Sequence, residues 1–156
     1  MKIKSALFPS LIGTTAMTML SYSVSESKDE NFKEPKLLAE LVEKIFADEY
    51  KSLAKPSGWV MHYTMGFLMT AVFQEFWKQT DTIPNAKKGA YAGIVSGVAG
   101  ILIWKTLFKV SKKNPKIPFK RYYGHLLLAH IVFSTGVALA SRFVTPFQDD
   151  KQKSTS

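Results

Sequence analysis

Four long runs without a charged residue dominate this sequence. A helix needs about 20 mostly apolar residues to cross a bilayer core that is about 30 Å thick. We therefore predict an all-α fold, an integral membrane four-helix bundle, whose spans cover about residues 5–25, 57–77, 88–108 and 122–143. The alternative is a soluble bundle with apolar core helices, which is disfavoured because soluble helices carry charges on almost every turn.

The first run also has a second interpretation. Lys2 and Lys4 precede an apolar stretch that ends in small residues, as in a secretory signal peptide. The distribution of positive charge favours a retained first helix, because cleavage would move the most basic loop to the outer side of the membrane.

That basic loop is the segment 109–121, which contains no acidic residue. Its cations are Lys109, Lys112, Lys113, Lys116, Lys120 and Arg121. Loops rich in Lys and Arg stay in the cytoplasm, and such cations bind anionic lipid headgroups. With four spans, segment 26–55 is then also cytoplasmic, and both termini lie outside.

An amphipathic helix is predicted at about 36–54, between the first two spans. Its apolar residues recur every three or four positions, and acidic and basic residues occupy the other face. Pro35 is placed to start this helix, and Lys55-Pro56-Ser57-Gly58 is expected to end it. The helix is too charged to cross a bilayer, so it should lie at the interface or pack on the bundle. Residues 1–146 form one transmembrane domain in this prediction, followed by a disordered tail over 147–156.

Small residues mark one face of the third span. Its glycines are Gly89, Gly93, Gly97 and Gly100. Small residues at such spacing let helix backbones approach closely inside a membrane. The pattern predicts a tight helix contact, within the bundle rather than between two copies of the chain.

Polar residues at membrane depth form the candidate site. They are His62, Thr70, Gln74 and His130. Their simplest role is hydrogen bonding across helices. Alternatively, they line the path of a small transporter or channel, or His62 and His130 ligate a b-type haem as axial ligands. We expect His125, five residues before His130, to face elsewhere, and we expect no carboxylate beside the histidines, so no metal site is predicted.

Catalytic motifs do not guide the interpretation further. The chain has no cysteine, and it contains no phosphate-binding loop, zinc-protease motif or serine-hydrolase motif. We therefore expect a non-enzymatic membrane protein, a subunit or accessory factor of a membrane assembly. Its partners would be lipid, another protein or a second copy of itself, and not nucleic acid.

The order of several short motifs resembles a known group of proteins. Gly13-Thr14-Thr15-Ala16-Met17-Thr18 and Pro35-Lys36-Leu37-Leu38 are followed by His62-Tyr63-Thr64-Met65-Gly66, by the glycines from 93 to 100 and by Gly124-His125. This order is similar to that of the YagU-type group of small four-span bacterial inner-membrane proteins, over about residues 5–143. The resemblance implies a fold and a bacterial inner-membrane location. It implies no reaction or cofactor, because the group has no established activity.

Overall fold

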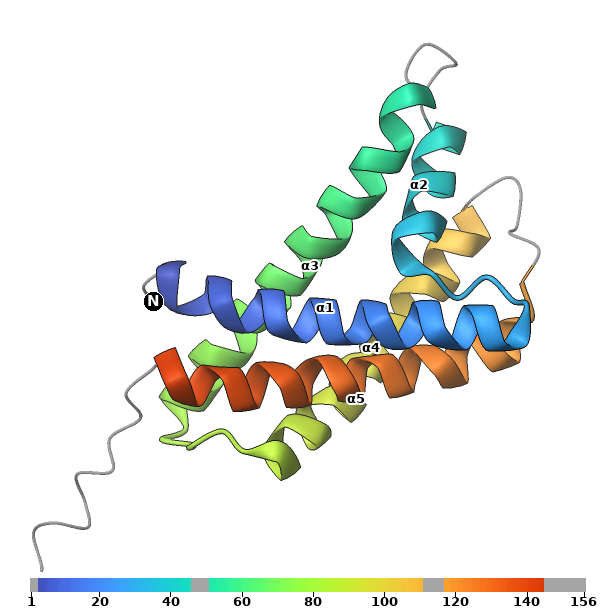
Figure 1. The fold of residues 1–156 in the computed structure, drawn as a ribbon. Helices are drawn as coiled ribbons and strands as arrows, with labels where there is room; N and C mark the ends of the chain where they lie inside the picture. Colours follow the sequence, from blue (N-terminus) through green and yellow to red (C-terminus); the bar gives the residue numbers. More distant parts are fainter. Residues whose placement is uncertain (1–2, 46–50, 111–116, 145–156) are drawn as a thin grey trace, which may run out of the picture.

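The structure, a computed structural model, describes residues 3–45, 51–110 and 117–144, and every regular element in these ranges is an α-helix (Figure 1). The all-α prediction is therefore confirmed. The helices are α1 (Ile3–Lys28), α2 (Glu34–Ile45), α3 (Lys51–Gln79), α4 (Ala86–Val110) and α5 (Phe119–Val144).

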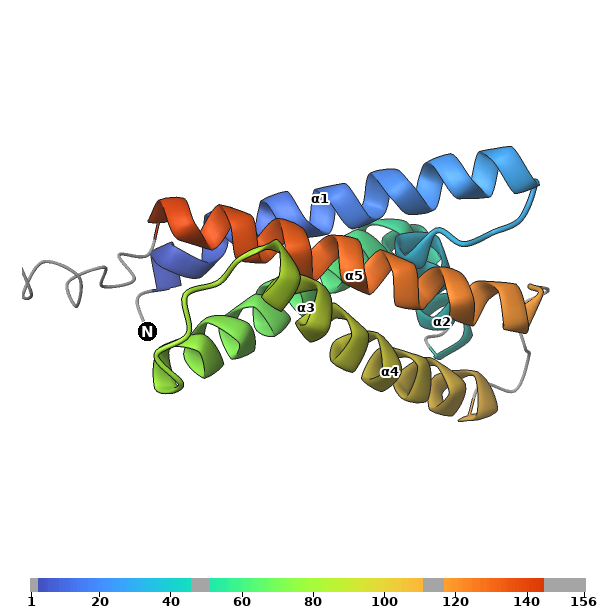
Figure 2. The same cartoon turned by 90° about the horizontal axis from the view of Figure 1, so that it is seen from below.

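Helix α5 has a central position in the bundle. It runs antiparallel beside α1 on one side and packs against α4 on the other, as Figure 2 shows. Helix α3 crosses α1, and α2 folds back to pack on the first half of α3. Residues from all five helices therefore surround one interior.

Among the described residues, two helices are long and apolar enough to cross a membrane, judged by length and composition: residues 86–109 of α4 and α5 as a whole. Helices α1 and α3 are 26 and 29 residues long, so length does not exclude them. They are more polar on average, because α1 carries many hydroxyl side chains and α3 carries several charged residues at its ends. Length and composition thus mark α4 and α5 as candidate membrane spans, and they do not confirm the prediction of four spans.

The amphipathic helix differs from the expected 36–54. Helix α2 is described from Glu34 to Ile45, and α3 already begins at Lys51, so Leu53 belongs to α3. The expected end at Pro56 was wrong, because Pro56 lies inside α3. A proline removes one backbone hydrogen bond from a helix. Here the helix continues because it packs closely on α2: a Cβ at Gly58 would collide with the carbonyl oxygen of Pro35.

Large apolar side chains lie on the outside of the bundle, and several polar side chains are buried inside it. The outer faces of the four long helices carry large apolar side chains, among them Met19, Val60, Val95 and Phe143 with exposed fractions of 66%, 65%, 73% and 85%. The interior contains hydroxyl, amide and imidazole side chains. The fully buried polar residues are Ser21, Thr70, Ser134 and Ser141.

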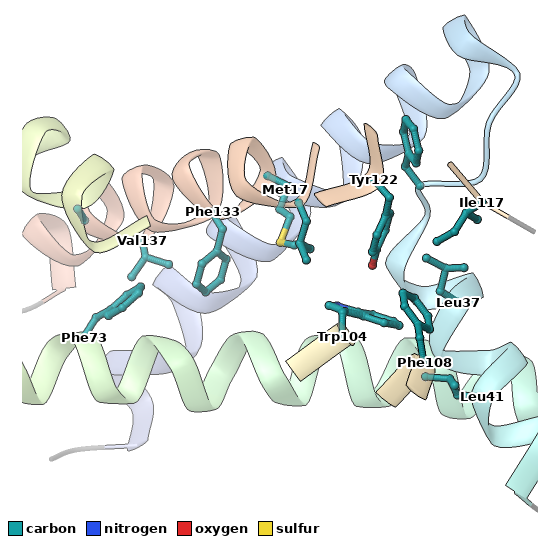
Figure 3. Packing of buried hydrophobic residues seen from close by; sticks show 14 of the residues in the cluster. Met17, Leu37, Leu41, Phe73, Trp104, Phe108, Ile117, Tyr122, Phe133 and Val137 are labelled. Carbon is teal, nitrogen blue, oxygen red and sulfur yellow. The ribbon is translucent and has the colours of Figure 1, made fainter. Parts of the chain in front are cut away.

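An aromatic cluster closes one end of the interior (Figure 3). Tyr122 of α5 is completely buried, with its ring centroid 5.8 Å from that of Trp104 and 5.9 Å from that of Phe108. Leu37 and Leu41 of α2 complete the cluster. The apolar face of α2 therefore packs against the interior of the bundle.

Candidate functional site

A cavity of about 140 Å³ lies between the long helices, and both predicted interior histidines line it. His62 comes from α3 and His130 from α5. Most of the remaining lining is apolar, including Met61, Met65 and Met69 of α3. The structure thus brings together two of the four residues of the predicted site.

Hydrogen bonding assigns the protonated nitrogen of His62. The Thr18 hydroxyl donates its single hydrogen to the Thr14 carbonyl oxygen at 2.7 Å. It must therefore accept the hydrogen bond that joins its Oγ1 to His62 Nε2 at 2.9 Å. In the neutral ring, Nε2 of His62 carries the hydrogen, and Nδ1 keeps a lone pair that can accept.

The same reasoning applies to His130. Its Nδ1 lies 2.9 Å from the carbonyl oxygen of Leu126, which can only accept, so Nδ1 carries the hydrogen. Nε2 is then the acceptor. Gly100 of α4 makes room for this edge of the ring, because a Cβ there would lie 2.9 Å from His130 Nε2.

Thr14 of α1 also lines the cavity, with its hydroxyl packed against Gly66 of α3. It is 1% exposed, and its Oγ1 has no hydrogen-bond partner. A Cβ at Gly66 would collide with this oxygen, so the glycine leaves space for the hydroxyl. Thr70, a predicted site residue, does not line the cavity and instead donates to the Gly66 carbonyl oxygen at 2.8 Å.

A second polar cluster joins α1, α2 and α5. Ser21 Oγ donates to Glu34 Oε1 at 2.8 Å and lies 2.9 Å from His125 Nε2. The imidazole of His125 stacks on the Phe32 ring, with centroids 5.1 Å apart. As expected, His125 does not line the cavity that holds His130.

Glu34 corrects the expectation that no carboxylate accompanies the histidines. Its Oε1 lies 3.8 Å from His125 Nε2, and its other oxygen, Oε2, is buried without a hydrogen-bond partner. Burial raises the pKa of this carboxyl to about 7, although the hydrogen bond from Ser21 opposes the shift. Glu34 also lines the cavity. Sequence reasoning missed it because its position at the start of α2 suggests only a helix terminus.

Gln74 lies apart from the cavity, where α1, α3 and α5 meet. Its Nε2 donates to the Ser5 carbonyl oxygen at 2.9 Å and to Ser141 Oγ at 3.1 Å. The amide therefore links three helices. Thr70 thus bonds within its own helix and Gln74 bonds to α1 and α5, whereas His62 and His130 line a shared cavity.

The predicted glycine face of α4 packs on α5. Cβ atoms at Gly89 and Gly93 would meet α5 backbone atoms, and one at Gly97 would lie 2.7 Å from the Leu127 side chain. Gly100 faces the His130 ring. These glycines thus place α4 against α5 within one chain.

The basic loop is described only at its ends. Lys109 and Lys120 are exposed, and Arg121 Nη1 lies 2.7 Å from Glu30 Oε1 in an ion pair. Lys112, Lys113 and Lys116 lie outside the described residues.

The cavity was also tested for haem. A cavity of about 150 Å³ holds a single benzene ring, so one of 140 Å³ is too small for a porphyrin with four pyrrole rings. The iron-binding nitrogen of His130 also faces Gly100 at close range. The residues present therefore do not fit haem. Within the described ranges, no three His, Asp or Glu side chains are grouped to hold a metal ion.

Comparison with protein-family models, with curated proteins and with solved structures gives no match.

Proposed function

We propose that this chain is an integral membrane protein with four spans, formed by α1, α3, α4 and α5, and that its role is non-enzymatic. The apolar outer faces of the long helices carry this proposal. Large apolar side chains cover the outer faces of all four helices, and the polar side chains are buried between them. Water would disfavour both features, whereas a bilayer favours them, because hydrocarbon solvates apolar groups and leaves polar groups to find partners inside.

The two more polar helices fit this arrangement. In α1, Met19 and Leu7 are exposed, whereas Thr14, Thr18 and Ser21 are buried. In a membrane, such hydroxyl groups face neighbouring helices and bond to backbone or side-chain partners. The low average hydropathy of α1 thus arises from its inward face.

We further propose a bacterial inner membrane, with loop 109–121 and α2 on the cytoplasmic side and both termini outside. Because the chain has no cysteine, single cysteines introduced at exposed lysines report the side directly. An impermeant maleimide added to intact cells should label Lys78→Cys and Lys87→Cys. Lys28→Cys and Lys120→Cys should react only after permeabilisation. Equal labelling of Lys87→Cys and Lys120→Cys from one side would show that α4 does not cross the membrane.

The intact mass of the purified protein tests whether the first helix is retained. A mass equal to that of all 156 residues supports four spans. A loss of the first 20 to 30 residues, about the length of a signal peptide, would show that α1 is cleaved.

The biochemical role that we propose is that of a subunit or accessory factor in a membrane assembly. Two features support it: a small helical body, and several polar side chains that bond one another across helices. A photocrosslinking residue at Val95, which is 73% exposed on α4, should capture a defined partner protein in native membranes. The control position is Ser23, on the exposed face of α1. Recovery of the protein alone from both positions would count against this role.

A small transporter is the second candidate, and the cavity lined by His62 and His130 favours it. In proteoliposomes, a solute flux should be lost in both His62→Ala and His130→Ala. Gly124→Ala is the matched control, because a Cβ there meets nothing within 4 Å. Flux that is unchanged in both histidine variants would exclude this site.

A further inference from the structure

The cavity between the long helices has its mouth between α3 and α4. Helix α4 packs on α5, and α3 packs on α1 and α2, whereas α3 and α4 scarcely contact each other along their described lengths. The lining residues that are more than a third exposed are Met61 and Met65 of α3 and Ile103 and Leu107 of α4. The lining residues of α1, α2 and α5 are all less exposed. Three helices therefore close the cavity, and it opens sideways between the other two.

The accessible wall of the cavity is apolar. Thr14 Oγ1 and Glu34 Oε2 are covered by neighbouring atoms. His62 Nε2 and His130 Nδ1 are already hydrogen-bonded, and Nε2 of His130 packs against Gly100. Most of the other lining side chains are methionine, leucine, isoleucine and aromatic residues. A buried water molecule needs about two to four polar partners, so this space favours hydrocarbon over water.

The size of the cavity fits a hydrocarbon chain. A cavity of about 150 Å³ binds benzene, so one of 140 Å³ accommodates about six carbon atoms. A helix with its side chains is about 10–12 Å across and does not fit inside. In the proposed membrane, lipid surrounds the mouth at a far higher concentration than any protein. The flexible side chains of Met61, Met65 and Met69 can adapt to the shape of a chain.

We infer that the cavity binds one acyl chain of a bilayer phospholipid. A segment of this chain passes between α3 and α4 and packs against Trp104 and the three methionines. It restores the dispersion contacts that the lining atoms would lose beside a void. The bound chain also bridges two helices that scarcely contact each other, so lipid completes the packing of the bundle. This inference rests on the membrane location proposed above.

The tryptophans provide the test, and the chain has three of them. Trp104 lines the cavity although it is only 8% exposed. Trp77 is 2% exposed and does not line the cavity, and Trp59 is 40% exposed. The full chain is placed in nanodiscs of phosphatidylcholine with bromine on one acyl chain, near its start, middle or end in separate samples. Bromine quenches tryptophan fluorescence only at short range, so an acyl chain in the cavity quenches Trp104.

Three variants each keep one tryptophan and have phenylalanine at the other two positions. We expect the loss of fluorescence of Trp104 to approach that of Trp59 and to exceed that of Trp77. The three bromine positions ensure that depth in the membrane does not decide this comparison. Trp104→Phe in the otherwise unchanged chain gives a second measurement, because the quenching that it removes belongs to Trp104. This second measurement does not require the other tryptophans to be replaced.

Adjacent residues of α4 provide matched variants in the chain that keeps only Trp104. Ile103→Phe places a larger side chain at the mouth of the cavity and should reduce the quenching. Leu102→Phe changes an exposed residue that does not line the cavity and should leave the quenching unchanged. Equal quenching in these two variants would show that the acyl chain does not enter between α3 and α4, contrary to the inference.

Failure of the acyl-chain site and failure of the membrane location give different results. If Trp59 is quenched and Trp104 is quenched only as weakly as Trp77, the protein lies in the membrane and the acyl-chain site is refuted. A second copy of the chain that covers the mouth would give this result. If no bromine position quenches Trp59, the proposed membrane location is itself refuted.

Discussion

Gly93→Ala tests how closely α4 packs on α5. The added methyl group would lie 2.7 Å from the His130 carbonyl oxygen and 2.9 Å from the Ile131 backbone nitrogen, and closer still to Ile131 Cα. Ordinary contacts are 3.4–4 Å. Backbone atoms cannot turn aside as a side chain can, so the two helices must separate by about 1 Å at this point.

The expected effect combines two opposing terms. Overpacking of this kind destabilises a protein by about 1–3 kcal/mol. Alanine in place of glycine favours the helix by up to about 1 kcal/mol. Gly124→Ala on α5 isolates the second term, because a Cβ there meets nothing within 4 Å. We therefore expect Gly93→Ala to be less stable than Gly124→Ala by about 1–3 kcal/mol.

The assay is the unfolding free energy in mixed micelles, followed by circular dichroism and tryptophan fluorescence. Gly97→Ala should fall between the other two variants, because its closest contact is the flexible Leu127 side chain at 2.7 Å and the nearest backbone atom is 3.2 Å away. If Gly93→Ala is as stable as Gly124→Ala, the described contact between α4 and α5 is wrong.

Three further predictions concern the buried polar groups. Burial raises the pKa of Glu34 from 4.5 to about 7. The folded protein therefore binds this proton more tightly than the unfolded chain does. The unfolding free energy should fall by about 3 kcal/mol as the pH rises from the lower to the higher pKa. Glu34→Gln should remove that slope from a series of unfolding measurements between about pH 4.5 and 8, and an unchanged slope would show that another group titrates. Ser21→Ala breaks two buried hydrogen bonds and should destabilise by about 1–3 kcal/mol in the same assay, whereas Ser27→Ala at an exposed position should have little effect. Gln74→Leu removes the amide that links three helices and should cost about 1–3 kcal/mol, against little change for the exposed Gln79→Leu; equal stability of these two variants would contradict the described contacts.

Several features of the fold could be predicted because they depend on neighbours along the chain. The lengths of the uncharged runs predicted four long helices, and all four are present, with ends close to the expected ones except for the start of α3. The start of α2 near Pro35 follows from local backbone preferences. The helix end predicted at Pro56 was wrong: α3 continues through Pro56, and Gly58 packs on α2, a contact that local sequence does not reveal.

The candidate site could be predicted only in part. His62 and His130 were selected as interior residues at similar depth, and the structure places both on one cavity. Thr70 lies on the same stripe but donates to its own helix, and Gln74 bonds elsewhere. Spacing along a helix predicts which side chains share a face, but not which of them meet a neighbouring helix.

The sequence alone therefore determined the helical class and the central residues of each long helix, since periodicity and run length are properties of a single segment. Only the tertiary structure decided that Glu34 meets Ser21 and His125, and that Gly100 opens space beside His130. These contacts join residues far apart in the chain, and they depend on how α2 folds back and how α4 lies on α5. Helix crossings arise from the packing of whole faces, which no single segment encodes.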